Sequence, residues 1–382
     1  VERTPFLDAL NKTQSVVEKK NTSPILSNIL CSVRGKELSI FATDLEVGVK
    51  IKINIDESEN SPQKEKLQEQ TPEKLNEERV SFPAKYFLDI VRELPHNQKI
   101  IITKKENNWV ELLSGKSKFN MVSLSPDEFP TLPEFENKKY IDARVSSLKQ
   151  MIDSTAFAIS TDATRYTLTG VYFEPLDQQI MRMTALDGHR LSFVDQEVFL
   201  KTPNMKSGII IPKKGLGELR KLIEESSSSV GLAIERGNLF ATYLNTHLFI
   251  RLIEGEFPDY RQVIPSSKEK TIKIKKEEFN SALKRASLFA NEKSKAVRFS
   301  LQDTTLTITT SNPDMGEAKE EVEVEYSGEP TEVGFNFKYL LDYLAIVQSE
   351  YLEFSMKDQQ NAGILRGVGQ QYHTYVIMPM RA

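Results

Sequence analysis

The segment with the clearest potential for chemistry is Leu186-Asp187-Gly188-His189-Arg190, which places a carboxylate two residues from an imidazole. Such a pair could supply a general base and the acid that orients it. Asp-Gly between two apolar runs is also a strong hairpin signal, and we favour a turn over a catalytic site. The four histidines lack the H-x-x-x-H or H-x-H spacing of a metal site. No phosphate-binding glycine loop or nucleophile elbow accompanies them. The sequence therefore indicates no catalytic residue, no metal site and no cofactor.

Basic pairs on the expected helices are the next candidates, because lysine and arginine contact phosphates without reading base sequence. The expected helices span 6–20, 82–94, 146–160, 212–225, 277–295 and 335–350. Together they carry a net charge of +2, against −6 for the rest of the chain. A solvated helix surface explains the same pairs equally simply. The pairs are Lys19-Lys20, Lys213-Lys214, Arg220-Lys221 and Lys284-Arg285.

The elements that would position these residues repeat along the chain. A ten-residue pattern begins at Phe82, Ile211 and Phe335, each time with a large apolar residue first, lysine fourth and an acid eighth. Each copy is typical of a strand end that runs into a helix. A second amphipathic helix precedes each copy, and alternating runs such as 37–41, 239–243 and 305–309 predict antiparallel strands. The fold class is therefore α+β, with three similar domains of two helices each.

The repeats set the domain boundaries. We expect an N-terminal domain over 1–138, a central domain over 139–268 and a C-terminal domain over 269–382. Residues 56–79 form a polar run that lengthens the first domain, and we interpret this run as an inserted loop. A charged regulatory helix is the alternative for this segment.

Composition excludes several classes of protein. With 50 basic and 54 acidic side chains the 382-residue chain has a net charge of −4, which argues against a histone-like binder that wraps nucleic acid. The single cysteine, Cys31, excludes a disulfide framework and a cysteine-based zinc site. The sequence contains neither a long apolar run that could span a membrane nor an N-terminal secretory signal. We therefore expect a cytoplasmic protein with no membrane partner.

Two strands and the tail present possible interaction surfaces. Lys116 and Lys118 share one face of a strand in the first domain, and the run 317–325 places acids on one face of a strand in the third. Opposite ends of two chains could pair through them and close a ring, or both could be independent solvated edges. The apolar tail 375–382 is compatible with a buried last strand or with the rim of a peptide groove.

The chain resembles the bacterial DNA polymerase III beta subunit, the replicative sliding clamp, along nearly its whole length. No single match is decisive, but their order across three domains is specific. The matching segments are 23–30 (SPILSNIL), 42–46 (ATDLE), 164–166 (TRY), 186–191 (LDGHRL), 257–261 (FPDYR), 290–293 (ANEK), 326–328 (YSG) and 375–381 (YVIMPMR).

The resemblance implies a DNA-clamp fold and a head-to-tail homodimer that forms a ring of six domains. Helices would line a hole around double-stranded DNA, which is contacted without sequence specificity. The family has no active site of its own. It tethers the replicative polymerase alpha subunit, is closed around DNA by a loader that includes the delta subunit, and binds other proteins that carry a clamp-binding motif.

The resemblance also assigns residues, all numbered in this sequence. A partner-peptide cleft between the second and third domains would use Leu168, Leu186, Gly188, His189, Arg190, Leu191, Pro258, Val263, Asn336, Tyr339, Val376, Met378, Pro379, Met380 and Arg381. DNA contacts would fall on Lys20, Arg92, Tyr166, Lys213, Lys214 and Lys221. The ring interface would join Lys116, Lys118 and Phe119 of one chain to Leu288, Phe289, Glu320 and Glu321 of the next.

Three positions depart from the family pattern. Leu186 stands where threonine is frequent, Gln262 where a second arginine is common, and the chain ends in Ala382 instead of leucine. We expect these changes to alter the cleft, and with it the peptide preference, without abolishing the site. The alternatives are a scaffold of the same fold that binds peptides without encircling DNA, and an enzyme that uses Asp187 and His189.

Overall fold

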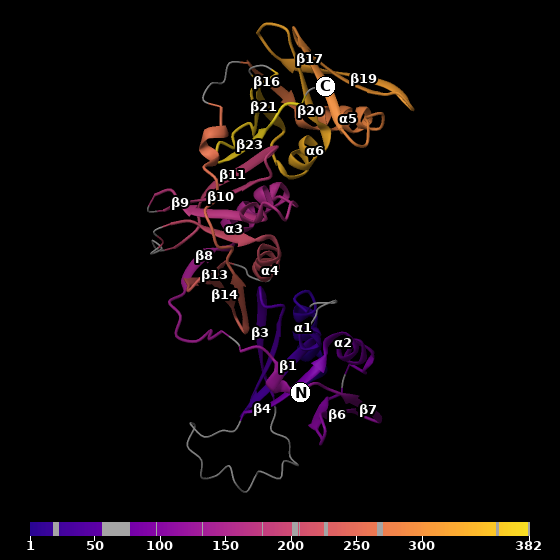
Figure 1. The fold of residues 1–382 in the computed structure, drawn as a ribbon, viewed down its shortest axis with the longest axis vertical. Coiled ribbons are helices and arrows are strands. Elements are labelled where there is room, and N and C mark those ends of the chain that lie inside the picture. Colours follow the sequence, from indigo (N-terminus) through magenta and orange to yellow (C-terminus); the bar gives the residue numbers. More distant parts are fainter. Residues whose placement is uncertain are drawn as a thin grey trace. The chain divides into compact units, whose positions relative to one another are not determined.

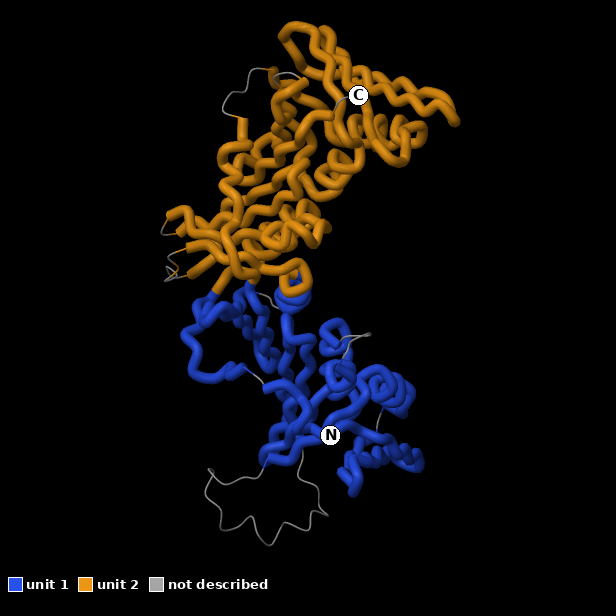
Figure 2. Tube along the Cα trace, in the orientation of Figure 1, with its two compact units in different colours: residues 1–142, 217–252 blue, residues 143–216, 253–382 orange. Residues whose placement is uncertain are grey.

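The structure is a computed structural model that describes residues 1–382 except 18–22, 56–76, 97, 132, 178, 201–204, 206, 225–227, 266–269, 357–358 and 381–382. The chain divides into two compact units, 1–142 with 217–252 and 143–216 with 253–382 (Figure 2). Lys20, Arg381, Ala382 and most of the predicted insertion lie outside the described residues.

The described residues contain six α-helices, which confirms all six predicted helices (Figure 1). Five of them begin directly after the last residue of a strand, and for α2, α4 and α6 the repeat predicts this junction. Proline precedes α2 and α4, and its fixed φ angle suits a helix start. The helices are α1 (Arg3–Thr13), α2 (Ala84–Glu93), α3 (Val145–Thr155), α4 (Lys213–Glu224), α5 (Lys276–Ser287) and α6 (Phe337–Ile346).

All six helices end before the predicted residue. Three of them, α1, α3 and α5, fall short by at least five residues, and each of these three ends at a hydroxyl side chain. The hydroxyl of Thr13 donates to the carbonyl of Leu10 at 2.8 Å, and that of Ser287 donates to the carbonyl of Lys284 at 2.7 Å. Thr155 donates to the carbonyl of Met151 in the same way. Hydroxyls that bond to a carbonyl of the last turn compete with the continuing backbone ladder. The predicted ends at 20, 160 and 295 are therefore wrong.

The first unit contains an eight-stranded antiparallel sheet and a three-stranded sheet. The pairing of β3 with β15 joins strands of the N-terminal and central domains in one sheet. The large sheet has the order β4 (Glu78–Pro83), β1 (Asn28–Arg34), β2 (Glu37–Thr43), β3 (Val47–Asn54), β15 (Thr246–Arg251), β14 (Asn238–Tyr243), β13 (Ser229–Glu235) and β8 (Ile141–Arg144). The small sheet has the order β5 (Ile101–Lys104), β6 (Trp109–Ser114) and β7 (Ser117–Val122).

The predicted insertion is too long at its C-terminal end. Glu78 and Arg79 belong to β4, where Arg79 lies opposite Ser32 of β1. Their polarity resembles that of the preceding run, but ladder hydrogen bonds and an ion pair between Arg79 and Asp127 at 2.6 Å hold them in the strand. The polar composition of residues 56–79 alone did not reveal that β4 begins at Glu78.

The second unit contains one twelve-stranded sheet, and β11 pairs with β23, so strands of the central and C-terminal domains share it. Its order is β12 (Ile209–Pro212), β9 (Gly170–Pro175), β10 (Ile180–Leu186), β11 (Arg190–Glu197), β23 (His373–Ile377), β22 (Gly363–Gly367), β21 (Tyr351–Met356), β16 (Lys270–Lys275), β19 (Gly316–Glu325), β18 (Thr305–Asn312), β17 (Ala296–Gln302) and β20 (Thr331–Asn336).

The C-terminal domain shows how the predicted alternation builds a core. In β18, Leu306 and Ile308 are fully buried, while the threonines that alternate with them, Thr305, Thr307 and Thr309, are half-buried. Helices α5 and α6 lie together against this part of the unit (Figure 1). Phe335 and Phe354 meet beneath them with ring centres 5.3 Å apart. Burial of each such ring stabilises the fold by about 1.5–3 kcal/mol. No helix among the described residues is long and apolar enough to cross a membrane.

Candidate peptide-binding site

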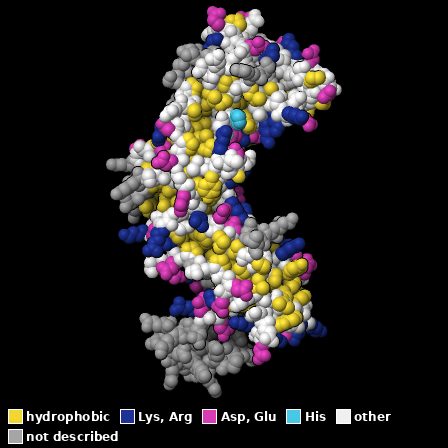
Figure 3. All heavy atoms as spheres, viewed as in Figure 1, with side chains coloured by type: hydrophobic (Ala, Val, Ile, Leu, Met, Phe, Trp, Pro, Cys, Tyr) yellow, Lys and Arg dark blue, Asp and Glu magenta, His cyan; other side chains and the backbone are white. Residues whose placement is uncertain are grey.

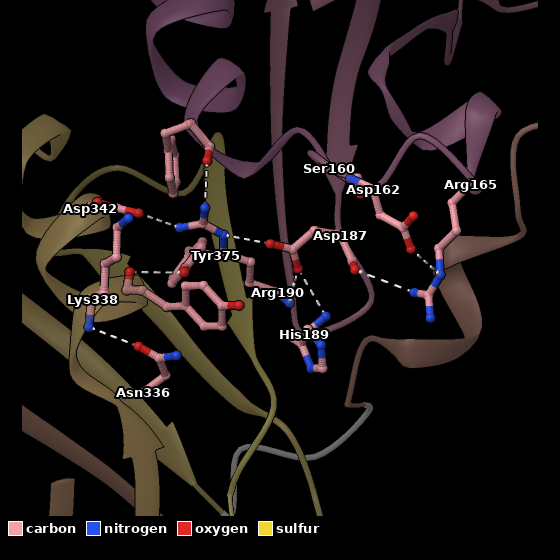
Figure 4. Close-up of polar contacts among 12 residues, drawn as sticks. Ser160, Asp162, Arg165, Asp187, His189, Arg190, Asn336, Lys338, Asp342 and Tyr375 are labelled. Atoms are coloured by element: carbon pink, nitrogen blue, oxygen red, sulfur yellow. Dashed lines mark hydrogen bonds and ion pairs between the residues drawn. The ribbon is translucent and has the colours of Figure 1, made fainter. Parts of the chain in front are cut away.

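The Asp187-Gly188 segment forms a hairpin turn between β10 and β11, as predicted (Figure 4). One carboxylate oxygen of Asp187 accepts hydrogen bonds from the backbone amides of His189 and Arg190, at 2.9 and 3.0 Å. The other accepts from the Arg190 side chain at 3.0 Å. Gly188 has a φ angle of 91°, and a Cβ atom there would lie 2.4 Å from the Arg165 guanidinium. The carboxylate is occupied in shaping the turn, which does not leave it available to orient the imidazole.

Arg190 connects the turn to the C-terminal domain. Its Nη1 atom lies 2.6 Å from a carboxylate oxygen of Asp342 in α6, and its Nη2 atom donates to the carbonyl of Phe157 at 2.7 Å. The guanidinium also lies 4.4 Å from the centre of the Tyr339 ring, within the range of a cation–π contact. Because only 9% of this side chain is exposed, these partners replace water around the charge.

A polar cavity of about 340 Å³ opens beside this arginine. Four predicted cleft residues, His189, Arg190, Asn336 and Tyr339, meet there. The His189 ring is stacked on Tyr339 with centres 6.3 Å apart, and burial, with Asp187 nearby, raises the pKa of the Tyr339 phenol. The cavity also contains residues absent from the predicted set: Ile159, Ser160, Thr161, Asp162, Arg165, Asp187, Lys295 and Lys338.

The C-terminal tail contains the buried last strand that was one of the two alternatives left open by the sequence. All five residues of β23 are buried, so the strand extends through Ile377. The backbone amide of Met378 then donates to the carbonyl of His189 at 2.8 Å, and that of Met380 donates to the carbonyl of Gly334 at 2.8 Å. The Met378 side chain is 39% exposed. The tail is thus a buried strand followed by a partly exposed rim, residues 378–380, that is anchored through its backbone.

An apolar cluster continues from this rim. Leu191 and Val376, both buried, pack in it with Phe193, Tyr260, Ala362 and Ile364, and Leu186 packs against it. Of the other predicted cleft residues, Leu168 is buried in a short 3₁₀ helix (Tyr166–Leu168), whereas Pro258 and Val263 are exposed. The described part of the predicted cleft therefore has buried apolar members, exposed apolar members and one polar cavity. Such a mixture suits a short peptide with apolar anchors.

The predicted DNA contacts are distributed over both units. Arg92 lies in the last turn of α2 and is half-exposed beside Asp89, Tyr166 is 58% exposed, and Lys213 and Lys214 begin α4. Lys221 lies farther along α4, 2.8 Å from Glu218. Figure 3 shows lysine and arginine interspersed with aspartate and glutamate on the face that it draws.

The residues predicted for a ring interface lie on two strands and one helix end. In the first unit, Glu111 contacts Lys105 at 2.8 Å and Lys118 at 2.5 Å, and these hydrogen bonds lower its pKa. Lys118 and Phe119 lie on β7, the last strand of the small sheet, and Lys116 lies in the turn before it. The predicted strand over 116–121 is therefore confirmed from Ser117 onward.

The acidic counterpart lies in the second unit. Arg285 binds both carboxylate oxygens of Glu320, at 2.9 and 2.5 Å, and this hydrogen bonding lowers the pKa of Glu320. Glu320 and Glu321 lie on β19, which pairs with β16 only through Glu325 and Val324. Leu288, 69% exposed, and the half-buried Phe289 follow α5. β7 and β19 thus each have one edge along which backbone N–H and C=O groups can pair with another strand, except at Val324 and Glu325 of β19.

Within the part of the chain that the structure describes, no group of three or more His, Cys, Asp or Glu side chains could hold a metal ion.

The fold is that of DNA polymerase sliding clamps. Three family models match the chain: the N-terminal, central and C-terminal domains of the DNA polymerase III beta subunit, over residues 1–133, 143–259 and 261–381. The chain belongs to the DNA polymerase III beta subunit family. It has the three-domain clamp fold, and it serves as a processivity clamp, an accessory subunit of DNA polymerase III without catalysis of its own.

Full-length relatives support this placement. The chain is 30% identical to the beta sliding clamp of Pseudomonas aeruginosa and 33% identical to that of Caulobacter vibrioides, in each case over 100% of this chain and 99% of the relative. A crystal structure of the Pseudomonas aeruginosa beta subunit has a TM-score of 0.90 at 30% identity, covering 100% of this chain and 99% of that one. A Bartonella birtlesii clamp bound to griselimycin has a TM-score of 0.88 at 32% identity, covering 100% and 99%.

Proposed function

We propose that two copies of the chain form a head-to-tail ring that encloses double-stranded DNA, and that short motifs of other replication proteins bind the cleft beside Arg190. The observation that carries this proposal is the tail, which is anchored at Met378 and Met380 by backbone hydrogen bonds while Met378 remains exposed. A rim that is ordered before binding loses little conformational entropy when a peptide binds.

The cleft comprises an apolar part and a polar part. Leu186, Leu191 and Val376, with Pro258 and Val263, would receive the apolar anchors of the peptide. His189, Asn336 and Tyr339 would contact its polar groups from the cavity. Leu168, Gly188 and the tail residues Met378, Pro379, Met380 and Arg381 complete the proposed set. Clamps from Pseudomonas aeruginosa and Bartonella birtlesii have been solved bound to griselimycin, and we propose that this chain binds the same ligand in this cleft.

The ring would close through the edge strands β7 and β19. Lys116 and Lys118 would approach Glu320 and Glu321 of the next chain, while Leu288 and Phe289 would be buried against Phe119. Main-chain hydrogen bonds between the two edges would supply the register, and opposite charges would select the head-to-tail orientation. Such a contact joins two different surfaces and closes after two copies when the rotation allows.

DNA would be held by topology and by weak phosphate contacts. We propose Lys20, Arg92, Tyr166, Lys213, Lys214 and Lys221 as contacts. These proposed contacts are few, and two of the side chains already lie near an acidic residue of their own helix: Lys221 near Glu218 and Arg92 near Asp89. A closed ring slides well with such contacts, because each one contributes little and none depends on base sequence.

The proposed partners are the replicative polymerase alpha subunit, the delta subunit of the clamp loader and other proteins with a clamp-binding motif, all in the cytoplasm. Loading on nicked circular DNA by the loader tests the ring, since a closed clamp is retained on the circle and slides off after linearisation. A scaffold that binds peptides without encircling DNA would not be retained on the circle, so linearisation would release none of it.

A further inference from the structure

We propose that a row of three charged residues, Glu174, Arg182 and Asp195, positions the loop 257–263 and thereby sets one wall of the peptide cleft. The inference rests on the cleft of the proposed function, but the loop contacts can be tested without any peptide. Glu174, Arg182 and Asp195 are positioning residues, because they act on the cleft through the loop.

The row lies across three neighbouring strands. Arg182 of β10 is directly opposite Glu174 of β9 and Asp195 of β11 in the sheet register. Its guanidinium binds Asp195 through two parallel contacts of 2.6 Å and lies 4.2 Å from the centre of the Phe193 ring. A paired and stacked guanidinium of this kind has one favoured orientation.

Both carboxylate oxygens of Glu174 hold the loop. The Tyr260 hydroxyl donates to one oxygen at 2.5 Å, and the Arg261 guanidinium donates to the other at 2.8 Å. Glu174 is 7% exposed and Tyr260 3% exposed, so neither group has bulk water as an alternative partner. Burial and the hydrogen bond to Glu174 raise the pKa of the Tyr260 phenol. Hydrogen bonds to buried charged groups are among the stronger ones in proteins.

An aromatic contact fixes the start of the same loop. The Phe257 ring is stacked on Tyr172 of β9, with centres 4.9 Å apart and planes 6° apart. Between Phe257 and Val263 the chain forms a 3₁₀ helix of only four residues (Tyr260–Val263). A helix this short cannot hold its own conformation in water, so the side-chain contacts must determine where the loop lies.

The row and the cleft share one face of the sheet. Side chains alternate along a strand, so Arg182, Thr184 and Leu186 of β10 point to the same side. In β11, Asp195, Phe193 and Leu191 do the same, and Leu186 is paired with Leu191. The charged row thus lies at one end of this face and the cleft leucines at the other. Tyr260 packs in the apolar cluster with Leu191 and Val376, and the loop carries the exposed Pro258 and Val263.

Hydrogen exchange and peptide binding test the inference together. Tyr260→Phe removes one hydroxyl, Glu174→Ala removes both acceptors, and Glu174→Gln retains one acceptor. The matched control is Glu197→Gln, which alters an acid at the end of β11 in the same sheet, where it forms an exposed ion pair with Arg144 at 2.9 Å. We expect faster amide exchange in 257–264 for the first two variants, partial rescue by Glu174→Gln, and no change for the control.

Affinity is measured by fluorescence anisotropy with a labelled peptide that carries the clamp-binding motif of the polymerase alpha subunit. We expect Tyr260→Phe and Glu174→Ala to weaken binding roughly 5- to 30-fold. The double variant should be scarcely weaker than Glu174→Ala, because both changes break one contact. Unchanged loop exchange, or faster exchange with unchanged affinity, would overturn the inference. A wild-type protein that does not bind the peptide would instead refute the cleft, while the exchange data would still decide whether the row holds the loop.

Discussion

The guanidinium of Arg190 lies 2.6 Å from the carboxylate of Asp342, and this ion pair ties β11 of the central domain to α6 of the C-terminal domain. Arg190 follows the Asp187-Gly188 turn directly, so the turn and the helix are fixed by one side chain. The same arginine faces Tyr339, which lines the cavity. The pair therefore couples the stability of the domain junction to the shape of the cleft.

Replacing Asp342 with alanine should destabilise the protein by about 2–4 kcal/mol, because the Arg190 charge would remain buried without one of its partners. Urea unfolding followed by circular dichroism measures this loss. Peptide affinity should fall as well, since Tyr339 and His189 lose their fixed neighbour. The exposed pair Arg144–Glu197 provides the comparison: Arg144→Ala should cost less than about 1 kcal/mol. Equal losses for the two variants would show that the Arg190 pair contributes no more than a surface ion pair.

Deleting Met378 to Ala382 should abolish peptide binding and leave the dimer intact. The deletion removes the rim but retains β23, whose residues are all buried. Anisotropy with the labelled motif peptide and light scattering report the two properties separately. A truncated protein that is monomeric, or that binds the peptide as before, would contradict the assignment of the rim.

The substitution Leu288→Asp should split the ring, because closure would bury an unpaired carboxylate. Light scattering should then give the mass of one chain instead of two. Leu244→Asp is the control, since Leu244 is 81% exposed and lies outside the proposed interface. An unchanged mass for Leu288→Asp, or a halved mass for both variants, would argue against this interface.

We expect the protein to lose stability in mild acid because His373 is buried in its neutral form. Its ring is buried, 3.0 Å from the Ser192 hydroxyl, and burial lowers its pKa to about 4. An unfolded histidine titrates near pH 6.5, so between about pH 6.5 and 4 the unfolded state binds a proton that the folded state excludes. This linkage removes about 3 kcal/mol of stability as the pH falls through that range.

Urea unfolding at pH 7.5, 5.5 and 4.5 tests this pH dependence. Other groups titrate over the same range, so the comparison is between the wild type and His373→Gln. The variant should be less stable than the wild type at pH 7.5, and the difference should shrink by most of 3 kcal/mol at pH 4.5. A difference that is constant with pH would rule out His373 as the source.

Much of the fold could be predicted from local patterns. The threefold motif predicted strand ends that run into helices at Phe82, Ile211 and Phe335, and α2, α4 and α6 follow these positions. The Asp187-Gly188 hairpin was predicted because its signal is contained in two residues. Helix ends at Thr13 and Ser287 were missed, because hydroxyl side chains that bond to the last turn leave no change in apolar periodicity.

The contacts that organise the cleft could not be predicted from the residues alone. Asp342 is 152 positions from Arg190, and Tyr260 is 86 positions from Glu174. Their proximity depends on strand order and register in the twelve-stranded sheet, which local patterns do not determine. A buried glutamate in β9 gives no sign in the sequence that it holds a loop. The Asp-Gly-His-Arg segment was recognisable, but the partner of its arginine was not.

Retention on DNA tests the central claim most directly. The clamp is loaded on nicked circular DNA by its loader and ATP, isolated by gel filtration, and then exposed to an enzyme that linearises the circle. The proposed ring predicts that the wild type stays with the circle through isolation and leaves after linearisation, whereas Leu288→Asp is not retained at all. Release from the intact circle, or retention on the linear DNA, would contradict a closed ring that slides.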